Sequence, residues 1–404
     1  MMQIGITLLT ALYVALGAGS LPATPAPPPG PSAHPCAQRV FAGSRMPLQL
    51  PRGATVALLG PGRIAGADLS VPAQLPAAGE TLIVATRGGS ASARSVTLLP
   101  APALNGTLAT VDADCGITLY TRKSLTPLGT FVTADSPADA IYDRGKLLWA
   151  AAAGTSATRY DPAAGLTALR HAPDTAALLA DPAAHVVAQA SRDLPPSGDG
   201  ALTLYGDDPS AAPHRLSVGE TPEGLALSGD TAGSILVTAT NAGTLMEVDA
   251  RTARVTRTLH VGPRPFGVAV DAARGLAFVA LNAITAMRPS PAGGVVAVDI
   301  HRWHTRAVRH AAGLALGVAV DPARRRVFVT EELGTVLVLD EELHTVHPAL
   351  HPCELPWLPS IDFANQRLFV PCPRENRVAV YDLRTLRETA RMTTTAYPLR
   401  VVLP

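Results

Sequence analysis

Apolar positions along this chain form short runs, some continuous and some alternating with polar positions, and clusters of Gly, Pro, Asp and Arg separate them. Runs of this kind predict β-strands, because side chains alternate between the two faces of a strand and turn residues end it. The stretch 266–282 predicts two strands around a turn, 293–299 a third strand and 305–310 a fourth. The next stretch, 316–350, repeats this order. The predicted unit is therefore four antiparallel strands.

The unit recurs along the chain at a regular spacing. Gly-Val-Ala-Val-Asp begins at Gly267 and again at Gly317, and Phe-Val follows eleven residues later in both copies. The third strand of each unit ends in an aspartate, and successive aspartates are 41 to 50 residues apart. They are Asp161, Asp207, Asp249, Asp299, Asp340 and Asp382. Four-strand repeats of about 40–50 residues are typical of β-propeller blades. An earlier unit, with Thr121 in the aspartate position, brings the predicted number of blades to seven.

The chain ends with one further predicted strand, 399–403, which resembles the first strand of a unit and has no unit after it. The earliest unit lacks such a strand beside 107–111, so we expect the C-terminal strand to fill that place and remove an exposed edge. The predicted fold is all-β: a seven-bladed β-propeller over 105–404, with the C-terminal strand closing the first blade. Residues 36–104 do not match the repeat, and we expect a small β-domain or an appended sheet there.

The repeat motif resembles that of a known family. The pattern P-x-G-V-A-V-D-P-x(4)-V-F-V-T, followed by G-x-V-x-V-x-D and V-G-x-x-P, is similar to the YVTN-type β-propeller repeat, over 107–404 and most clearly over 219–382. The resemblance implies a seven-bladed fold, which in this family is found in binding modules and in lactonase-type hydrolases. Two stretches depart from the pattern: Trp-Leu-Pro-Ser at 357–360 and an insertion at 191–200. They affect the expected geometry of single blades.

The N-terminus predicts export. Residues 1–20 are mostly apolar and end in small residues, as in a secretory signal peptide, although they contain no Lys or Arg and an uncleaved anchor is the alternative. Residues 21–35 are Pro-rich and predict an extended linker. We therefore expect an extracytoplasmic protein, periplasmic or secreted.

Four cysteines in an exported chain are compatible with two disulfides. Cys353 and Cys372 fall in two loops of one predicted blade, so we expect them to pair. Cys115 lies in the corresponding loop of the first blade, where it could pair with Cys36. The alternative is free, partly buried thiols.

Two sets of loops are predicted to share one face of the propeller, because antiparallel strands alternate in direction. These are the connections between blades and the loops between second and third strands. Their polar and aromatic residues form the predicted ligand site over the channel mouth; the alternative is a set of solvated loop tips. The candidates are Asp139, Glu223, Arg264, Phe266 and Trp357 from the connections, with Asn241, Asn282, Glu331, Glu332, Arg374 and Glu375 from the loops.

We predict no metal and no cofactor. Glu331 and Glu332 with the acidic pair at 112 and 114 could offer oxygen ligands, but they lack the spacing of a calcium loop. His260, His310 and His351 occupy equivalent positions, yet packed sheets stand about 10 Å apart, whereas zinc needs each nitrogen at about 2.0–2.1 Å.

Two functions remain open. The first is a binding or interaction module whose partner is an unknown protein or a small molecule. The second is a lactone-opening hydrolase or related lyase at the same face, with Arg264 as electrophile and Glu332 as base. Nucleic acid is disfavoured, because aromatic residues make up only 4% of the chain and basic residues are scattered. We expect a monomer with no membrane span after signal removal.

Overall fold

The structure is a computed structural model in which the described residues are almost entirely β. It describes residues 38–48, 50, 52–87, 90–133, 135–152, 156–170, 174–192, 200–207, 211–229, 231–285, 288–289, 293–311 and 314–404. The predicted signal peptide, the predicted linker and Cys36 lie outside these residues. Within them there are two 3-10 helices, η1 (Ala272–Arg274) and η2 (Pro373–Glu375), and no α-helix. None of the described residues form a helix with the length and hydropathy needed to cross a bilayer.

Six four-stranded antiparallel sheets follow one another along the described chain. Their strands are β11 (Pro137–Asp143), β12 (Lys146–Ala151), β13 (Ser156–Asp161) and β14 (Gly165–Arg170); β15 (Thr175–Asp181), β16 (Val186–Ser191), β17 (Ala201–Tyr205) and β18 (His214–Ser217); and β19 (Pro222–Leu227), β20 (Ser234–Ala239), β21 (Thr244–Asp249) and β22 (Arg254–His260). The other three are β23 (Pro265–Asp271), β24 (Leu276–Leu281), β27 (Gly294–Asp299) and β28 (His304–His310); β29 (Ala315–Asp321), β30 (Arg326–Glu331), β31 (Thr335–Leu339) and β32 (Thr345–Leu350); and β33 (Ser360–Asp362), β34 (Arg367–Cys372), β35 (Arg377–Asp382) and β36 (Glu388–Thr393). A short hairpin of β25 (Ile284–Thr285) and β26 (Arg288–Pro289) lies between β24 and β27.

The repeated aspartates form the turns between third and fourth strands. The side chain of Asp249 accepts a hydrogen bond from the backbone N–H of Arg251 at 2.8 Å, and that of Asp382 accepts one from Arg384 at 3.0 Å. An aspartate that bonds its own backbone two residues on stabilises a tight turn. The regular spacing in the sequence is therefore the spacing of these turns.

The repeated glycines allow neighbouring sheets to pack closely. The first strands of successive sheets contact one another, β11 with β15, β15 with β19, β19 with β23, β23 with β29 and β29 with β33. A Cβ on Gly267 would lie 2.9 Å from the carbonyl oxygen of Leu316, and one on Gly317 would lie 3.0 Å from the Cα of Leu358. Real Cβ atoms do not approach backbone this closely, so the repeat needs glycine at these positions.

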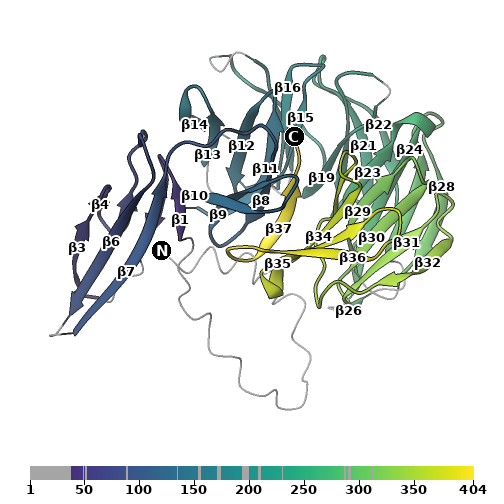
Figure 1. Cartoon of the computed structure of the whole chain (residues 1–404). Helices are drawn as coiled ribbons and strands as arrows, with labels where there is room; N and C mark the ends of the chain where they lie inside the picture. Colours follow the sequence, from purple (N-terminus) through teal and green to yellow (C-terminus); the bar gives the residue numbers. More distant parts are fainter. Residues whose placement is uncertain are drawn as a thin grey trace.

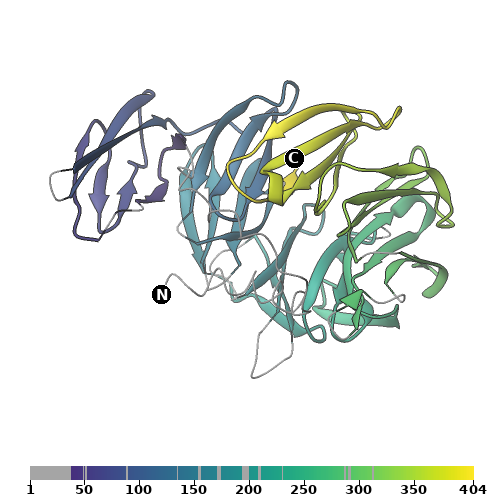
Figure 2. The ribbon, with the colours of Figure 1, turned by 90° about the horizontal axis from the view of Figure 1, so that it is seen from below.

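The C-terminal strand β37 (Pro398–Val402) does not join the sheet that precedes it in the chain. It pairs antiparallel with β8 (Thr107–Asp112), with Val402 opposite Ala109 and Val401 opposite Thr110. Next to β8 are β9 (Gly116–Thr121) and β10 (Pro127–Val132). Figure 2 shows the sheets following one another from blue through teal and green to yellow, with the yellow C-terminal sheet next to the blue one.

Residues before 105 extend that same sheet outward. Strand β1 (Arg39–Phe41) pairs parallel with β10 on one side and parallel with β7 (Ser90–Leu99) on the other. Beyond β7 follow β6 (Gly79–Arg87) and β3 (Thr55–Leu59), so the whole sheet has eight strands. A three-stranded sheet, β2 (Arg45–Pro47), β5 (Asp68–Ser70) and β4 (Arg63–Ala65), lies beside it. Figure 1 shows this N-terminal part as the purple layer on the left.

Candidate functional site

The two sets of loops that the sequence assigns to one face are hydrogen-bonded to each other. Asn282, after β24, donates its backbone N–H to the carbonyl of Arg264, before β23. Glu332, after β30, donates to Leu314, before β29, and Thr394, before β37, donates to Asn376, after β34. The loops and the connections therefore lie on the same side of the sheets.

Asp139 holds three sheets together. It is 3% exposed on β11, and its carboxylate accepts hydrogen bonds from Nη1 of Arg400 on β37 at 2.8 Å and from the backbone N–H of Leu178 on β15 at 2.9 Å. The Asp139 side chain is only 5% exposed, so removing Arg400 would leave a buried carboxylate without its cation. The structure thus places this predicted ligand residue in an internal structural bridge.

Glu223 is held in the same way. Its carboxylate accepts hydrogen bonds from both Nε and Nη2 of Arg192 at 2.8 Å. This bidentate ion pair links the insertion after β16 to strand β19. Its side chain is 6% exposed. Burial by itself would lower the pKa of Arg192, but the charge and hydrogen bonds of Glu223 outweigh burial and raise this pKa. Sequence reasoning did not single out Arg192, because its partner lies in the next sheet.

Arg264, Asn241 and Asn282 come together where the β19–β22 sheet connects to the β23–β28 sheet. Nη1 of Arg264 donates to Oδ1 of Asn241 at 3.4 Å, while Nδ2 of Asn241 donates to Thr221 at 2.8 Å. Arg264 has a left-handed backbone, with φ of 52°. Among the described residues, its buried Nε and the buried Oδ1 of Asn282 have no hydrogen-bond partner. Both atoms are buried, so they are polar groups left unsatisfied inside the protein.

Phe266 and Trp357 form an aromatic pair from two distant connections. Their ring centroids are 6.5 Å apart and the rings meet edge to face. Both side chains are half-buried. Phe266 is the second residue of β23, and Trp357 lies in the connection before β33. The whole β29–β32 sheet therefore lies between them in the sequence. Edge-to-face packing fixes the relative orientation of the rings.

Glu331 and Glu332 differ in environment. Glu331 is buried; its Oε2 accepts from the hydroxyl of Thr335, and its Oε1 has no partner among the described residues. Glu332 is half-buried, and burial raises the pKa of its carboxyl above the usual value. A carboxyl of this kind can exchange a proton closer to neutral pH than an exposed one.

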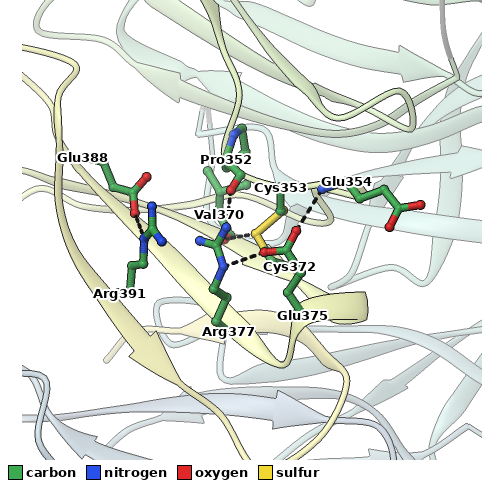
Figure 3. Close-up of a disulfide and its surroundings, with 9 residues drawn as sticks. All are labelled: Pro352, Cys353, Glu354, Val370, Cys372, Glu375, Arg377, Glu388 and Arg391. Atoms are coloured by element: carbon green, nitrogen blue, oxygen red, sulfur yellow. Dashed lines mark hydrogen bonds and ion pairs between the residues drawn. A yellow bond between two sulfur atoms is a disulfide. The ribbon is translucent and has the colours of Figure 1, made fainter. Parts of the chain in front are cut away.

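A disulfide anchors the connection that carries Trp357. Cys353 and Cys372 are bonded, with Cα atoms 5.9 Å apart, which confirms the predicted pair. Figure 3 shows the hydrogen bonds around it: Arg377 donates to the carbonyl of Pro352, and Glu375 accepts from both Arg377 and the backbone N–H of Glu354. Cys115 is also disulfide-bonded; its predicted partner, Cys36, lies outside the described residues.

The same connection is held at two further points. Nη1 of Arg374 donates to Glu354 at 2.5 Å, and the backbone N–H of Trp357 donates to Pro371 at 2.9 Å. Arg374 and Glu375 thus help to hold the connection 352–357.

The acidic residues and histidines that could ligate a metal lie in different parts of the fold. In the part of the chain that the structure describes, no group of three or more His, Cys, Asp or Glu side chains has an arrangement suited to a metal ion. His260 lies opposite Thr244 and His310 opposite Gly294, in the outer strands of two different sheets.

No protein-family model matches the chain, and no curated protein matches it. Solved structures do. A functionally unknown protein from Desulfotomaculum acetoxidans matches with a TM-score of 0.60 at 14% identity, over 74% of this chain and 100% of that chain. Sqt1 of Saccharomyces cerevisiae matches with a TM-score of 0.55 at 13% identity, over 72% and 83% of the two chains.

The dihydro-heme d1 dehydrogenase NirN, in complex with DHE, matches with a TM-score of 0.53 at 14% identity, over 79% of this chain and 72% of that chain. At such identities the likeness concerns the fold alone. The fold that this chain shares with Sqt1 and NirN is of the β-propeller type.

Proposed function

We propose that this protein is an exported seven-bladed β-propeller that binds a ligand at the mouth of its central channel. The proposal divides the chain into a signal peptide at 1–20, a linker at 21–35, an N-terminal β-region at 36–104 and the propeller at 105–404. Export is supported by the disulfide between Cys353 and Cys372, because disulfides persist mainly in oxidising compartments.

Seven blades would consist of the six four-stranded sheets and a seventh made of β37, β8, β9 and β10. Three contacts of β37 support a closed ring: it pairs with β8, and it also contacts β11 and β33. The bidentate ion pair of Arg122 with Asp362 adds a link between the turn after β9 and strand β33. Together with the repeat motif, this count supports membership of the YVTN-type family.

The aromatic pair of Phe266 and Trp357 carries the proposal of a ligand site. Two half-exposed rings from distant parts of the chain provide an apolar contact for a ligand. Arg264, two residues before Phe266, and the exposed Asn241 that it contacts supply polar side chains. Few polar groups around an apolar contact are typical of ligand sites. Asp139 and Glu223 take part by holding the sheets in place.

The test is a thermal unfolding series of the full chain with a panel of lactones, oligosaccharides and dipeptides. A ligand at a hundred times its dissociation constant stabilises the folded state by about 2.7 kcal/mol. We expect a ligand that shifts the wild-type melting temperature to shift Trp303→Leu equally and Trp357→Leu much less. Trp303 is the matched control, because it lies in the turn between β27 and β28, away from the proposed site. Its ring centroid is 4.5 Å from the guanidinium carbon of Arg257. Equal shifts in both variants, or no shift by any compound, would contradict the site.

A lactone-opening hydrolase is the second candidate. It is favoured by Glu332, because burial raises the pKa of its carboxyl, and Arg264 would act as the electrophile. Proton release from a γ-lactone, followed in a pH-stat, should then disappear in Glu332→Gln while the melting temperature stays unchanged. Absence of proton release from wild-type protein would reject the enzyme and leave the binding module.

A further inference from the structure

A buried polar group lies where β37 joins the sheet of β8, β9 and β10. Thr110 and Asp112 are two residues apart on β8, so their side chains lie on the same face of the strand. Thr110 is paired with Thr118 on β9, and Thr118 with Thr130 on β10. A row of threonines therefore crosses this face beside Asp112, and all four residues are at most 3% exposed.

Asp112 uses only one of its two carboxylate oxygens in hydrogen bonds. Its Oδ2 accepts from the hydroxyls of Thr118 and Thr395, whereas its Oδ1 has no partner among the described residues. The hydroxyl oxygen of Thr110 is also buried and without a partner there, although Thr110 is close enough to act on the carboxyl of Asp112. Buried polar atoms are normally hydrogen-bonded, so these two unused oxygens on one face point to a further bound group.

Further oxygen atoms from neighbouring elements lie close to this pair. The hydroxyl of Tyr120 on β9 donates to the backbone carbonyl of Thr393 on β36 at 2.9 Å. Burial and the charge of Asp112 raise the pKa of Tyr120, and the hydroxyl of Thr110 lowers it, so the three side chains are close together. The site therefore offers carboxylate, hydroxyl and carbonyl oxygens.

The negative charge of Asp112 is not balanced by a cationic side chain. Among the described residues, no Arg, Lys or His acts on its carboxyl. A buried carboxylate without a counter-charge is costly. A water molecule satisfies the hydrogen-bonding capacity of Oδ1 but does not cancel this charge, whereas a cation does both.

We propose that Asp112 and the hydroxyl of Thr110 bind a monovalent alkali cation between β8 and the connection 394–397 that leads into β37. Carboxylate, hydroxyl and carbonyl oxygens are the ligands of hard cations. The site has a single carboxylate, so an ion of charge +1 leaves it neutral, whereas a divalent ion leaves a buried positive charge. The cation would help to hold the connection, because Thr395 is hydrogen-bonded to Asp112.

The test is thermal unfolding of the full chain at pH 8 in the chlorides of sodium, potassium, calcium and tetramethylammonium at equal ionic strength. Tetramethylammonium is covered by methyl groups and cannot be coordinated by oxygen ligands, so it gives the reference for general salt effects. We expect sodium or potassium to raise the melting temperature by about 2–4 °C above this reference, as for a ligand at about ten times its dissociation constant. Calcium should give a smaller shift.

Three variants locate the cation. Asp112→Asn removes the charge and should abolish the difference between the alkali and tetramethylammonium salts. Thr110→Val removes a hydroxyl that has no other partner among the described residues, so it should reduce the alkali shift and leave unfolding in tetramethylammonium nearly unchanged. Asp114→Asn is the matched control: Asp114 is an exposed acid in the turn after β8, and the variant should keep the full shift.

The proposal is overturned if the melting temperature is the same in all four chlorides, which would leave Asp112 with a water molecule or a proton at Oδ1. It is also overturned if Asp112→Asn or Thr110→Val responds to the alkali cations as fully as wild type, or if calcium alone stabilises the protein. In tetramethylammonium Asp112→Asn should be at least as stable as wild type, since it no longer buries a charge. Its lost response to alkali cations is then distinct from a failure to fold.

Discussion

Asp112 illustrates how one buried carboxyl in this fold depends on its surroundings. It is fully buried at the end of β8, and its Oδ2 accepts hydrogen bonds from the hydroxyls of Thr118 at 2.7 Å and Thr395 at 2.6 Å. Its Oδ1 has no partner among the described residues. Burial is the main effect, and it raises the pKa of Asp112 from 3.8 to about 6 despite these hydrogen bonds.

We expect Asp112 to lower the stability of the folded protein at neutral pH. Well below pH 4 both states hold the proton. As the pH rises toward 6 and above, the unfolded chain loses it first, so the free energy of unfolding falls by about 3 kcal/mol. Asp112→Asn removes the carboxyl group that titrates. In urea unfolding at pH 4.5 and 7.5, the variant should be more stable than the wild-type protein at pH 7.5. The same pH dependence in both proteins would contradict the raised pKa.

At the scale of elements, close sheet packing depends on glycines whose Cβ would meet the next sheet. Gly317→Ala would place a Cβ 3.0 Å from Leu358 and closer still to Pro359. We expect a loss of about 1–3 kcal/mol in the free energy of unfolding, as in other overpacked positions. Gly206→Ala is the matched control, because nothing lies within 4 Å of that position. Chemical denaturation of both variants checks this; equal stability would contradict the packing argument.

The disulfide acts on a second element, the connection that carries Trp357. Cys353→Ala with Cys372→Ala opens a link across 19 residues. The chain-entropy model then predicts a loss of about 3 kcal/mol. Because Cys353 is only four residues before Trp357, acrylamide quenching of tryptophan fluorescence should also increase. Unchanged quenching together with unchanged stability would show that the hydrogen bonds of Arg377 and Glu375 suffice to hold the connection.

At the scale of the whole molecule, the two ends of the described chain meet in one sheet. Deleting residues 397–404 removes β37, and with it the pairing to β8 and the ion pair of Arg400 with Asp139. We expect the truncated protein to aggregate or to be cleaved rapidly, because β8 then presents an open edge. Limited proteolysis beside a chain shortened only by Pro404 tests this. A truncated protein as resistant as the control would show that β37 is dispensable.

Features within one repeat could be predicted from the sequence, whereas contacts between sheets could not. The strand runs, the turn aspartates and the pairing of Cys353 with Cys372 are local or repeat-level signals, and the sequence contains them. Arg192 with Glu223 and Arg400 with Asp139 join different sheets, so nothing near them in the sequence marks the pairs. These pairs place two predicted ligand residues in structural bridges.

The sequence by itself determined the repeating four-stranded unit, because apolar periodicity, turn residues and close-packing glycines are properties of short stretches. Only the tertiary structure decided how those units use their edges. It inserted β1 in parallel between β7 and β10 and brought the ring centroids of Phe266 and Trp357 within 6.5 Å of each other. Each of these depends on contacts between residues far apart in the chain, whose pairing follows from the packing of whole sheets.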